Sequence, residues 1–117
     1  MRIITGKARG CKLYTLEGTD TRPTTERVKQ AVFSMIQFDI EGRDVLDLFG
    51  GSGQMGLEAL SRGAQSAMFV DSAKEAIDVV KANAETTGFF SSQDVTVKSV
   101  ARRRVSASAV ANSFLIF

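Results

Sequence analysis

Residues 45–56 read Val45-Leu46-Asp47-Leu48-Phe49-Gly50-Gly51-Ser52-Gly53-Gln54-Met55-Gly56, and this stretch decides the fold class. A short apolar run ends on an acid, turns through a glycine cluster and enters a helical pattern. Glycine suits such a turn because it adopts positive φ and lets the backbone approach a ligand closely. The next apolar run, residues 67–70, ends on Asp71, twenty residues after Gly51. A strand, glycine loop, helix, strand and acid in this order predict a nucleotide-binding half-fold.

The acid beside the loop bears on which nucleotide binds. Gly51-x-Gly53-x-x-Gly56 satisfies the dinucleotide fingerprint, which alone is a weak signal. A pyrophosphate favours bare amides at a helix N-terminus, whereas Asp47 adds a carboxylate there. S-adenosylmethionine carries a sulfonium and an ammonium that a carboxylate attracts, so the pattern favours this cofactor over a nicotinamide or flavin. The simpler alternative, that Asp47 only caps the following turn, is compatible with cofactor binding.

The composition is that of an ordinary globular domain. The chain has 117 residues, 44% hydrophobic and 24% charged, which suffices for one core but is small for a complete doubly wound sheet. No apolar run approaches the roughly 18 residues of a membrane span, and residues 1–5 lack a signal-peptide pattern. With a single cysteine, Cys11, and no histidine, an internal disulfide, a zinc site and histidine catalysis are excluded. We therefore expect a cytoplasmic domain without metal or membrane contact.

Charge is distributed unevenly along the chain. Residues 1–30 contain seven basic and three acidic residues, a net charge of +4, whereas residues 31–98 contain five basic and ten acidic residues, a net charge of −5. A basic N-terminal part next to an acidic central part predicts a polyanionic partner bound near one edge of the domain. Ordinary solvated lysines and arginines are the alternative.

Alternating strands and helices predict a parallel α/β sheet. We expect strands near residues 45–48, 67–71 and 94–98, helices at 54–62 and 73–87, and a helix stop at Gly88. Residues 2–5 and 11–14 predict a β-hairpin with a basic loop, and residues 114–117 are a candidate fourth strand. A helix capped by Thr24 or Thr25 precedes the glycine loop. Its predicted apolar face consists of Val28, Ala31, Val32, Met35 and Ile36, with Phe33 packed beside it.

Three segments carry a more specific signal: residues 1–13 (MRIITGKARGCKL), residues 21–29 (TRPTTERVK), and the glycine loop with its continuation to residue 64 (EALSRGA). Together they resemble the bacterial RsmD family of 16S ribosomal RNA guanine-N2 methyltransferases. The resemblance extends from residue 1 to about residue 98. It implies a Rossmann-like, S-adenosylmethionine-dependent methyltransferase fold with helices on both faces of the sheet and an N-terminal β-hairpin. It also implies methyl transfer to the exocyclic N2 amine of a guanine, in ribosomal RNA or a small-subunit particle.

The resemblance further implies which residues form the sites. The cofactor candidates come from the glycine loop, the second strand and the segment before the first helix: Asp47, Phe49, Gly51, Ser52, Gly53, Asp71, Arg22, Thr24 and Thr25. The RNA-binding candidates are the basic hairpin residues Lys7, Arg9 and Lys12. Contacts of this kind to phosphates supply affinity and salt dependence rather than sequence choice.

The chain departs from the family at the catalytic motif. In the family, an Asn/Asp-Pro-Pro-Tyr/Phe loop accepts the hydrogens of the amine and stacks on the target base, but Pro23 is the only proline here. The catalytic residues are therefore unknown. We expect a hairpin extension in residues 1–20 and a Rossmann-like methyltransferase domain in residues 21–117, truncated or altered after about residue 98.

Three other functions compete with this interpretation. A noncatalytic domain that binds cofactor or RNA would account for the missing Pro-Pro pair. A related amino-methyltransferase of another nucleic acid would share the glycine loop, although the Arg-Pro-Thr-Thr segment at residues 22–25 favours the rRNA family. A nicotinamide-dependent oxidoreductase would share the dinucleotide fingerprint alone.

Overall fold

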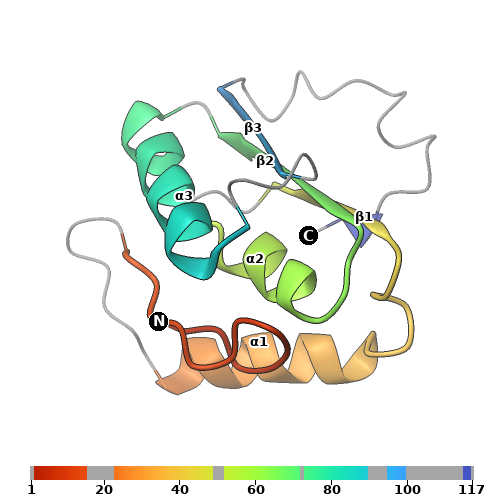
Figure 1. The fold of residues 1–117 in the computed structure, drawn as a ribbon. Helices are drawn as coiled ribbons and strands as arrows, with labels where there is room; N and C mark the ends of the chain where they lie inside the picture. Colours follow the sequence, from red (N-terminus) through yellow and green to blue (C-terminus); the bar gives the residue numbers. More distant parts are fainter. Residues whose placement is uncertain are drawn as a thin grey trace.

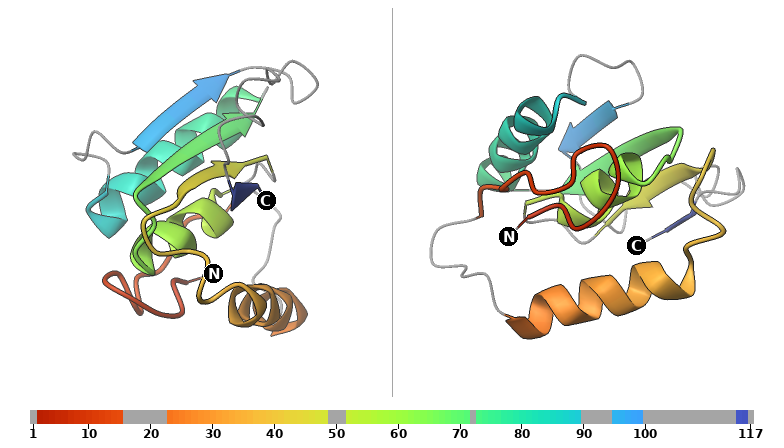
Figure 2. Two further views of the ribbon diagram at one scale, coloured as in Figure 1. Left: turned by 90° about the vertical axis from the view of Figure 1, so that its right-hand side faces the viewer. Right: turned by 60° about the horizontal axis from the view of Figure 1, so that its bottom comes forward.

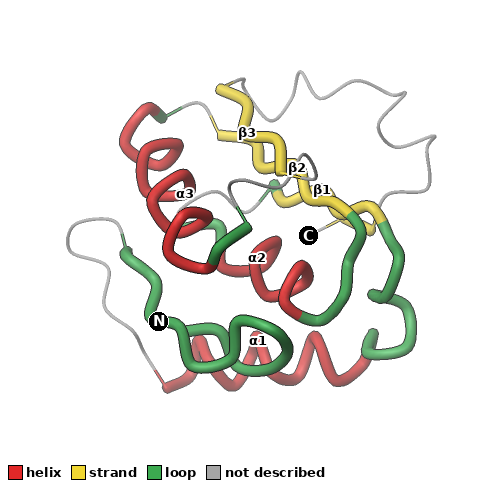
Figure 3. The backbone as a smooth tube through the Cα atoms, in the orientation of Figure 1, coloured by secondary structure: helices red, strands yellow, loops and turns green. Residues whose placement is uncertain are grey.

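A computed structural model describes residues 2–15, 23–48, 52–71, 73–89, 95–99 and 115–116. Figure 1 shows the ribbon and Figure 3 the same view coloured by secondary structure. The helices are α1 (Pro23–Met35), α2 (Gln54–Ser61) and α3 (Lys74–Thr87). The strands are β1 (Asp44–Asp47), β2 (Ser66–Asp71), β3 (Val95–Ser99) and β4 (Leu115–Ile116).

All four strands belong to one parallel sheet with the order β3-β2-β1-β4. Asp44 pairs with Ser66 and Asp47 with Phe69, which fixes the register of β1 against β2. On its other side β1 pairs with β4, so the candidate fourth strand is confirmed. The strand order reverses at β1, and open α/β sheets bind their ligands at such a switch point.

The core lies between the sheet and the helices α2 and α3, which run along it in Figures 1 and 2. Val45, Leu46 and Leu57 have no more than trace exposure, and α3 buries Val80 and Ala84. Strands covered in this way are expected to be apolar, and the interior residues of β1 and β2, 45–46 and 67–70, are. The predicted helices and the predicted strands of the parallel sheet are confirmed to within a few residues. Gly88 ends α3 in the left-handed conformation with φ of 84°.

The N-terminal residues form a tight antiparallel turn instead of the predicted two-stranded hairpin. The only pairing of strand type in residues 2–15 is the bridge between Arg2 and Lys12. Ile3 N–H donates to Cys11 O and Gly10 N–H donates to Ile3 O, each at 2.9 Å. The strands do not extend because the next two amides, of Ile4 and Thr5, donate to the side chain of Glu58. We refer to residues 2–15 as the N-terminal segment.

The apolar face predicted for α1 is wrong in part. Val28 is 58% and Met35 82% exposed, and Ala31 is exposed as well. The buried side is set instead by Lys29 and Phe33. Val32 and Ile36 of the predicted face are partly buried and pack against the hydrophobic core, to which Phe33 belongs. The buried side of α1 therefore combines these apolar contacts with the pairing of Lys29 to Glu58 and to the carbonyl of Arg2.

Candidate functional site

A pocket opens at the carboxyl ends of β1 and β2. It is lined by three of the candidate residues, Asp47, Gly53 and Asp71. Asp47 and Asp71 end neighbouring parallel strands, and for this reason both carboxylates lie at the same edge of the sheet. The remaining lining is apolar and consists of Phe69, Val70, Ile77 and Val80.

Asp47 ties β1 to the start of α2. The side chain is buried, and its Oδ2 accepts the Gly56 N–H at 2.9 Å. A carboxylate that accepts an amide in the first turn of a helix stabilises that end of the helix. The capping interpretation is thus correct for one oxygen of Asp47, in a residue that also lines the pocket.

Glycine is needed at positions 53 and 56 for two different structural reasons. Gly53 precedes α2 with φ of 75°, a left-handed conformation that favours glycine. Gly56 is required by packing, since a Cβ at this position would lie 2.4 Å from Cε1 of Phe69. The last glycine of the fingerprint therefore lets α2 approach β2.

Asp71 connects β2 to α3 in a similar way. Its Oδ1 accepts the Ala73 N–H at 2.9 Å, immediately before α3 begins. Its carboxylate is only partly buried. Both acids of the pocket are therefore oriented by a backbone amide at the start of the helix that follows their strand.

Three of the predicted cofactor residues, Arg22, Phe49 and Gly51, lie outside the described residues. Thr24 and Thr25 belong to the first turn of α1. Ser52 is buried, and its carbonyl accepts a hydrogen bond from Asn83 of α3 at 2.9 Å.

Lys7, one of the basic RNA candidates, lies at the other end of α2. Lys7 and Arg9 are exposed, and the Lys7 N–H donates to the carbonyl of Ser61, the last residue of α2. Ser61 Oγ also accepts the Ala8 N–H at 2.9 Å and donates to Thr5 O at 2.6 Å. The turn fits here because Gly6 has no Cβ, which would lie 1.9 Å from Ser61 O. Since α2 has eight residues, Lys7 and the glycine loop are separated by a helix about 12 Å long. Lys12 is likewise exposed.

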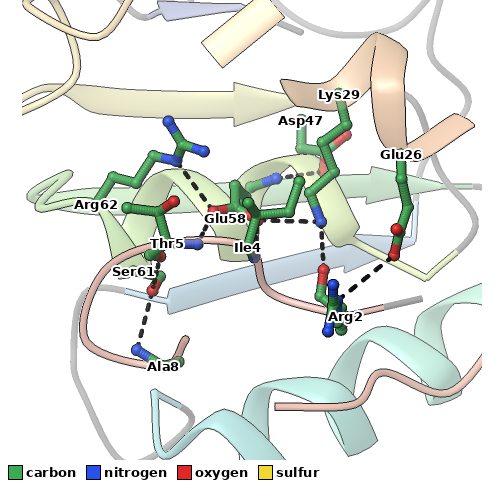
Figure 4. A network of polar contacts seen from close by, with 11 residues as sticks. Arg2, Ile4, Thr5, Ala8, Glu26, Lys29, Asp47, Glu58, Ser61 and Arg62 are labelled. Carbon is green, nitrogen blue, oxygen red and sulfur yellow. Dashed lines mark hydrogen bonds and ion pairs between the residues drawn. The ribbon is translucent and has the colours of Figure 1, made fainter. Parts of the chain in front are cut away.

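A buried charge network fixes the N-terminal segment to α1 and α2 (Figure 4). Glu58 has no exposed surface, and its Oε1 accepts the Ile4 N–H at 2.8 Å and lies 3.1 Å from Lys29 Nζ. Its Oε2 accepts the Thr5 N–H at 3.1 Å and the Arg62 Nε–H at 3.0 Å. Lys29 Nζ donates in addition to Arg2 O at 2.9 Å.

The electrostatics of this network are those of a desolvated cluster. Burial lowers the pKa of Lys29, and the carboxylate of Glu58 opposes that shift. Arg62 is better solvated and places its guanidinium 4.8 Å from the ring centroid of Phe33. Buried charges persist only when paired and hydrogen-bonded, and Glu58 meets this condition with four donors.

Sequence reasoning missed the roles of Lys29, Glu58, Ser61 and Asn83. Lys29 carried no such signal, because the periodicity of α1 leaves it off the predicted apolar face. Asn83 carried a usable signal, because it occupies a position on the buried side of its helix that an apolar residue would otherwise fill. Glu58 carried the same signal between Leu57 and Ala59.

Within the described ranges, His, Cys, Asp and Glu side chains form no group of three or more that could hold a metal ion. Over the same residues, no helix has the length and apolar character needed to cross a bilayer.

One protein-family model, described as Conserved hypothetical protein 95, matches residues 1–117. The chain belongs to this family. The resemblance to the RsmD methyltransferases is thereby confirmed.

Curated relatives of the chain are named as rRNA methyltransferases. The chain is 49% identical over 86 residues to YlbH of Bacillus subtilis, which is named provisionally as an rRNA methyltransferase, covering 74% of the chain and 47% of YlbH. It is 40% identical over 93 residues to Ribosomal RNA small subunit methyltransferase D of Haemophilus influenzae, covering 80% of the chain and 48% of that protein. The chain thus spans about half the length of these curated relatives.

Solved structures agree with the family on the fold. A hypothetical protein of Thermus thermophilus superposes with a TM-score of 0.76 at 32% identity, over 96% of this chain and 62% of its own. The protein yhhF of Escherichia coli, named provisionally as a methyltransferase, superposes with a TM-score of 0.73 at 35% identity, over 86% and 52% of the two chains. The predicted Rossmann-like methyltransferase fold is therefore confirmed.

Proposed function

We propose that this chain is the cofactor-binding part of an S-adenosylmethionine-dependent methyltransferase that modifies the N2 amine of a guanine in 16S rRNA. The observation that carries the proposal is the pocket at the carboxyl ends of β1 and β2, which is lined by Asp47, Gly53 and Asp71. The family and the named activities of the relatives support the same reaction.

The chemistry of the pocket fits S-adenosylmethionine better than a dinucleotide. Two carboxylates suit a ligand that carries an ammonium, a sulfonium and ribose hydroxyls, and they repel a pyrophosphate. The apolar wall of Phe69, Ile77 and Val80 offers burial for uncharged atoms. Close to the loop, Gln54 Oε1 is buried without a hydrogen-bond partner in the described structure, which leaves an acceptor available for a ligand donor.

In this proposal the residues of the chain bind and orient rather than transfer protons. S-adenosylmethionine, when bound, supplies a methyl group already activated on its sulfonium. Asp71 accepts the ribose hydroxyls, as the acid after the second strand does in related folds. Asp47 and the backbone around Gly53 hold the cationic side of the cofactor. Alignment of this kind is what a transfer between two bound reactants requires.

The RNA would be held at the basic N-terminal segment. Lys7, Arg9 and Lys12 are exposed there and would contact phosphates. The target guanine must be presented unstacked, from a loop or by flipping. RNA that contacts both Lys7 and the cofactor pocket would span the length of α2.

The chain has no Pro-Pro pair to accept the hydrogens of the amine and stack on the base. We therefore expect the 117-residue chain to bind cofactor with little or no turnover. Methyl transfer to 30S particles by this chain at a rate typical of the family would contradict that expectation. Cofactor affinity without turnover would also fit the alternative of a noncatalytic binding domain.

The first test is a thermal melt and a calorimetric titration with S-adenosylhomocysteine, the product of the cofactor. A ligand that binds only the folded state raises the melting temperature. Asp71→Asn retains the acceptor for Ala73 N–H but removes the charge, and we expect it to weaken binding at least about tenfold, as for a lost charge-assisted hydrogen bond.

The matched control is Asp78→Asn, which removes an exposed carboxylate from α3 outside the pocket. It should leave the affinity unchanged. A cooperative melt that S-adenosylhomocysteine does not shift would refute the cofactor assignment, and a shift with reduced nicotinamide cofactor would favour the oxidoreductase.

A further inference from the structure

Asn83 of α3 joins two parts of the chain that are far apart in sequence. Its Oδ1 accepts the Tyr14 N–H at 2.6 Å, and its Nδ2 donates to Tyr14 O and to Ser52 O, each at 2.9 Å. The side chain has no exposed surface. The side-chain amide of Asn83 thus binds the N–H and the carbonyl of Tyr14 in the N-terminal segment, and it also binds the carbonyl of Ser52 in the glycine loop.

This arrangement specifies asparagine. The Tyr14 N–H needs an acceptor, while the two carbonyls need two donors, and a carboxamide is the small group that offers both. Aspartate would keep the acceptor but would point an oxygen at each carbonyl. Alanine would leave three backbone groups without their partner in a buried place, where each unmade bond is costly.

The two segments that Asn83 joins belong to different sites of the proposed enzyme. Ser52 immediately precedes Gly53, which lines the cofactor pocket. Tyr14 lies at the end of a segment that carries the three basic RNA candidates. Glu58 and Ser61 hold the other part of that segment, along α2. Asn83 is therefore placed to transmit a change in the segment directly to the loop.

We propose that Asn83 is a positioning residue that couples the N-terminal segment to the cofactor loop, so that docking of the segment holds Ser52 and Gly53 in their binding conformation. This proposal rests on the proposed function for its ligands. Coupling between two sites is reciprocal, so cofactor binding must stabilise the docked segment as much as the docked segment strengthens cofactor binding. RNA held by the segment then raises the affinity for the cofactor.

The test compares Asn83→Ala and Asn83→Asp with Thr86→Ala. Thr86 is exposed on the same helix, and its hydroxyl donates to the carbonyl of Ala82, one turn away. At a temperature where all variants are folded, we expect both Asn83 variants to weaken S-adenosylhomocysteine binding about tenfold, equivalent to one net hydrogen bond, and Thr86→Ala to leave it unchanged.

Hydrogen exchange gives a readout that a purely structural role would not move. In the parent chain, S-adenosylhomocysteine should slow exchange in residues 12–15 although they do not line the pocket. In Asn83→Asp that remote protection should disappear while the ligand, at saturation, still protects residues 52–56.

The outcomes separate this proposal from the proposed function. If the parent chain binds no S-adenosylhomocysteine, the proposed function fails. The coupling is then tested by hydrogen exchange without ligand, where Asn83→Ala must speed exchange in residues 12–15 and in residues 52–56 together. If binding is normal in both Asn83 variants, or if only the N-terminal segment loosens, the coupling is refuted.

Discussion

Glu58 illustrates how a single carboxylate can hold three elements. It accepts two amides of the N-terminal segment, pairs with Lys29 of α1 and lies on α2. We expect Glu58→Gln to lower the free energy of unfolding by about 3–5 kcal/mol, because it leaves a buried ammonium without its counter-charge. Urea unfolding followed by circular dichroism measures this.

Two companions make that measurement specific. Glu75→Gln changes an exposed carboxylate in the first turn of α3 and should have little effect. Adding Lys29→Met to Glu58→Gln removes the uncompensated cation and should recover part of the loss. A Glu58→Gln variant as stable as the parent would show that the network contributes nothing.

Gly56 permits a second prediction about one residue. A methyl group there would lie 2.4 Å from the Phe69 ring, so Gly56→Ala should destabilise the chain by about 1–3 kcal/mol through overpacking. Replacing the ring in the double variant Gly56→Ala/Phe69→Leu makes room, and its loss relative to Phe69→Leu alone should be smaller. If Gly56→Ala destabilises the parent and the Phe69→Leu variant equally, the destabilisation does not come from contact with the Phe69 ring and has another cause, for example the backbone of the loop.

At the scale of elements, α1 offers a test of which face is buried. Phe33 is buried whereas Met35 is 82% exposed. We expect Phe33→Ala to cost about 3–5 kcal/mol of unfolding free energy and Met35→Gln to change it by less than about 0.5 kcal/mol. Chemical unfolding of both variants checks this. A larger loss of unfolding free energy for Met35→Gln than for Phe33→Ala would show that the face predicted from periodicity is the buried one.

The elements themselves follow from sequence wherever local patterns determine them. The strands and the helices α2 and α3 are predicted because apolar spacing, Gly88 and the glycine loop agree with one another. Parallel strands that end in acids also place Asp47 and Asp71 at one edge. The face of α1 and the short N-terminal turn could not be predicted in this way. Both depend on Glu58, which competes for the amides and the lysine from a distant position in the sequence.

For the whole molecule, the burial of Lys29 makes stability depend on pH. Its pKa in the folded chain is lowered, so between that value and the ordinary lysine pKa of about 10.4 the unfolded chain binds the proton that the folded chain lacks. The contribution of this group to the free energy of unfolding therefore increases as the pH rises through that interval.

The comparison for this effect is Lys29→Arg, because arginine keeps the charge and does not titrate in this range. We expect the stability of the parent minus that of Lys29→Arg to increase as the pH rises toward the ordinary lysine pKa of about 10.4. Urea unfolding at several pH values measures the difference, and the other titrating groups cancel between the two proteins. A constant or decreasing difference would contradict a lowered pKa.

The hydrogen bonds of the N-terminal segment have a consequence for biosynthesis. Ile4 finds its partner 54 positions later in the chain, and Tyr14 finds its partner 69 positions later. At about 5–20 residues per second on the ribosome, the last of these partners is made roughly 3–14 s after the residue that needs it. During that interval Ile3 and Leu13, both buried in the finished fold, belong to a segment that lacks part of the hydrogen bonds that dock it. The N-terminal segment therefore docks fully only after α3 has been synthesised, and its apolar side chains are open to chaperones until then.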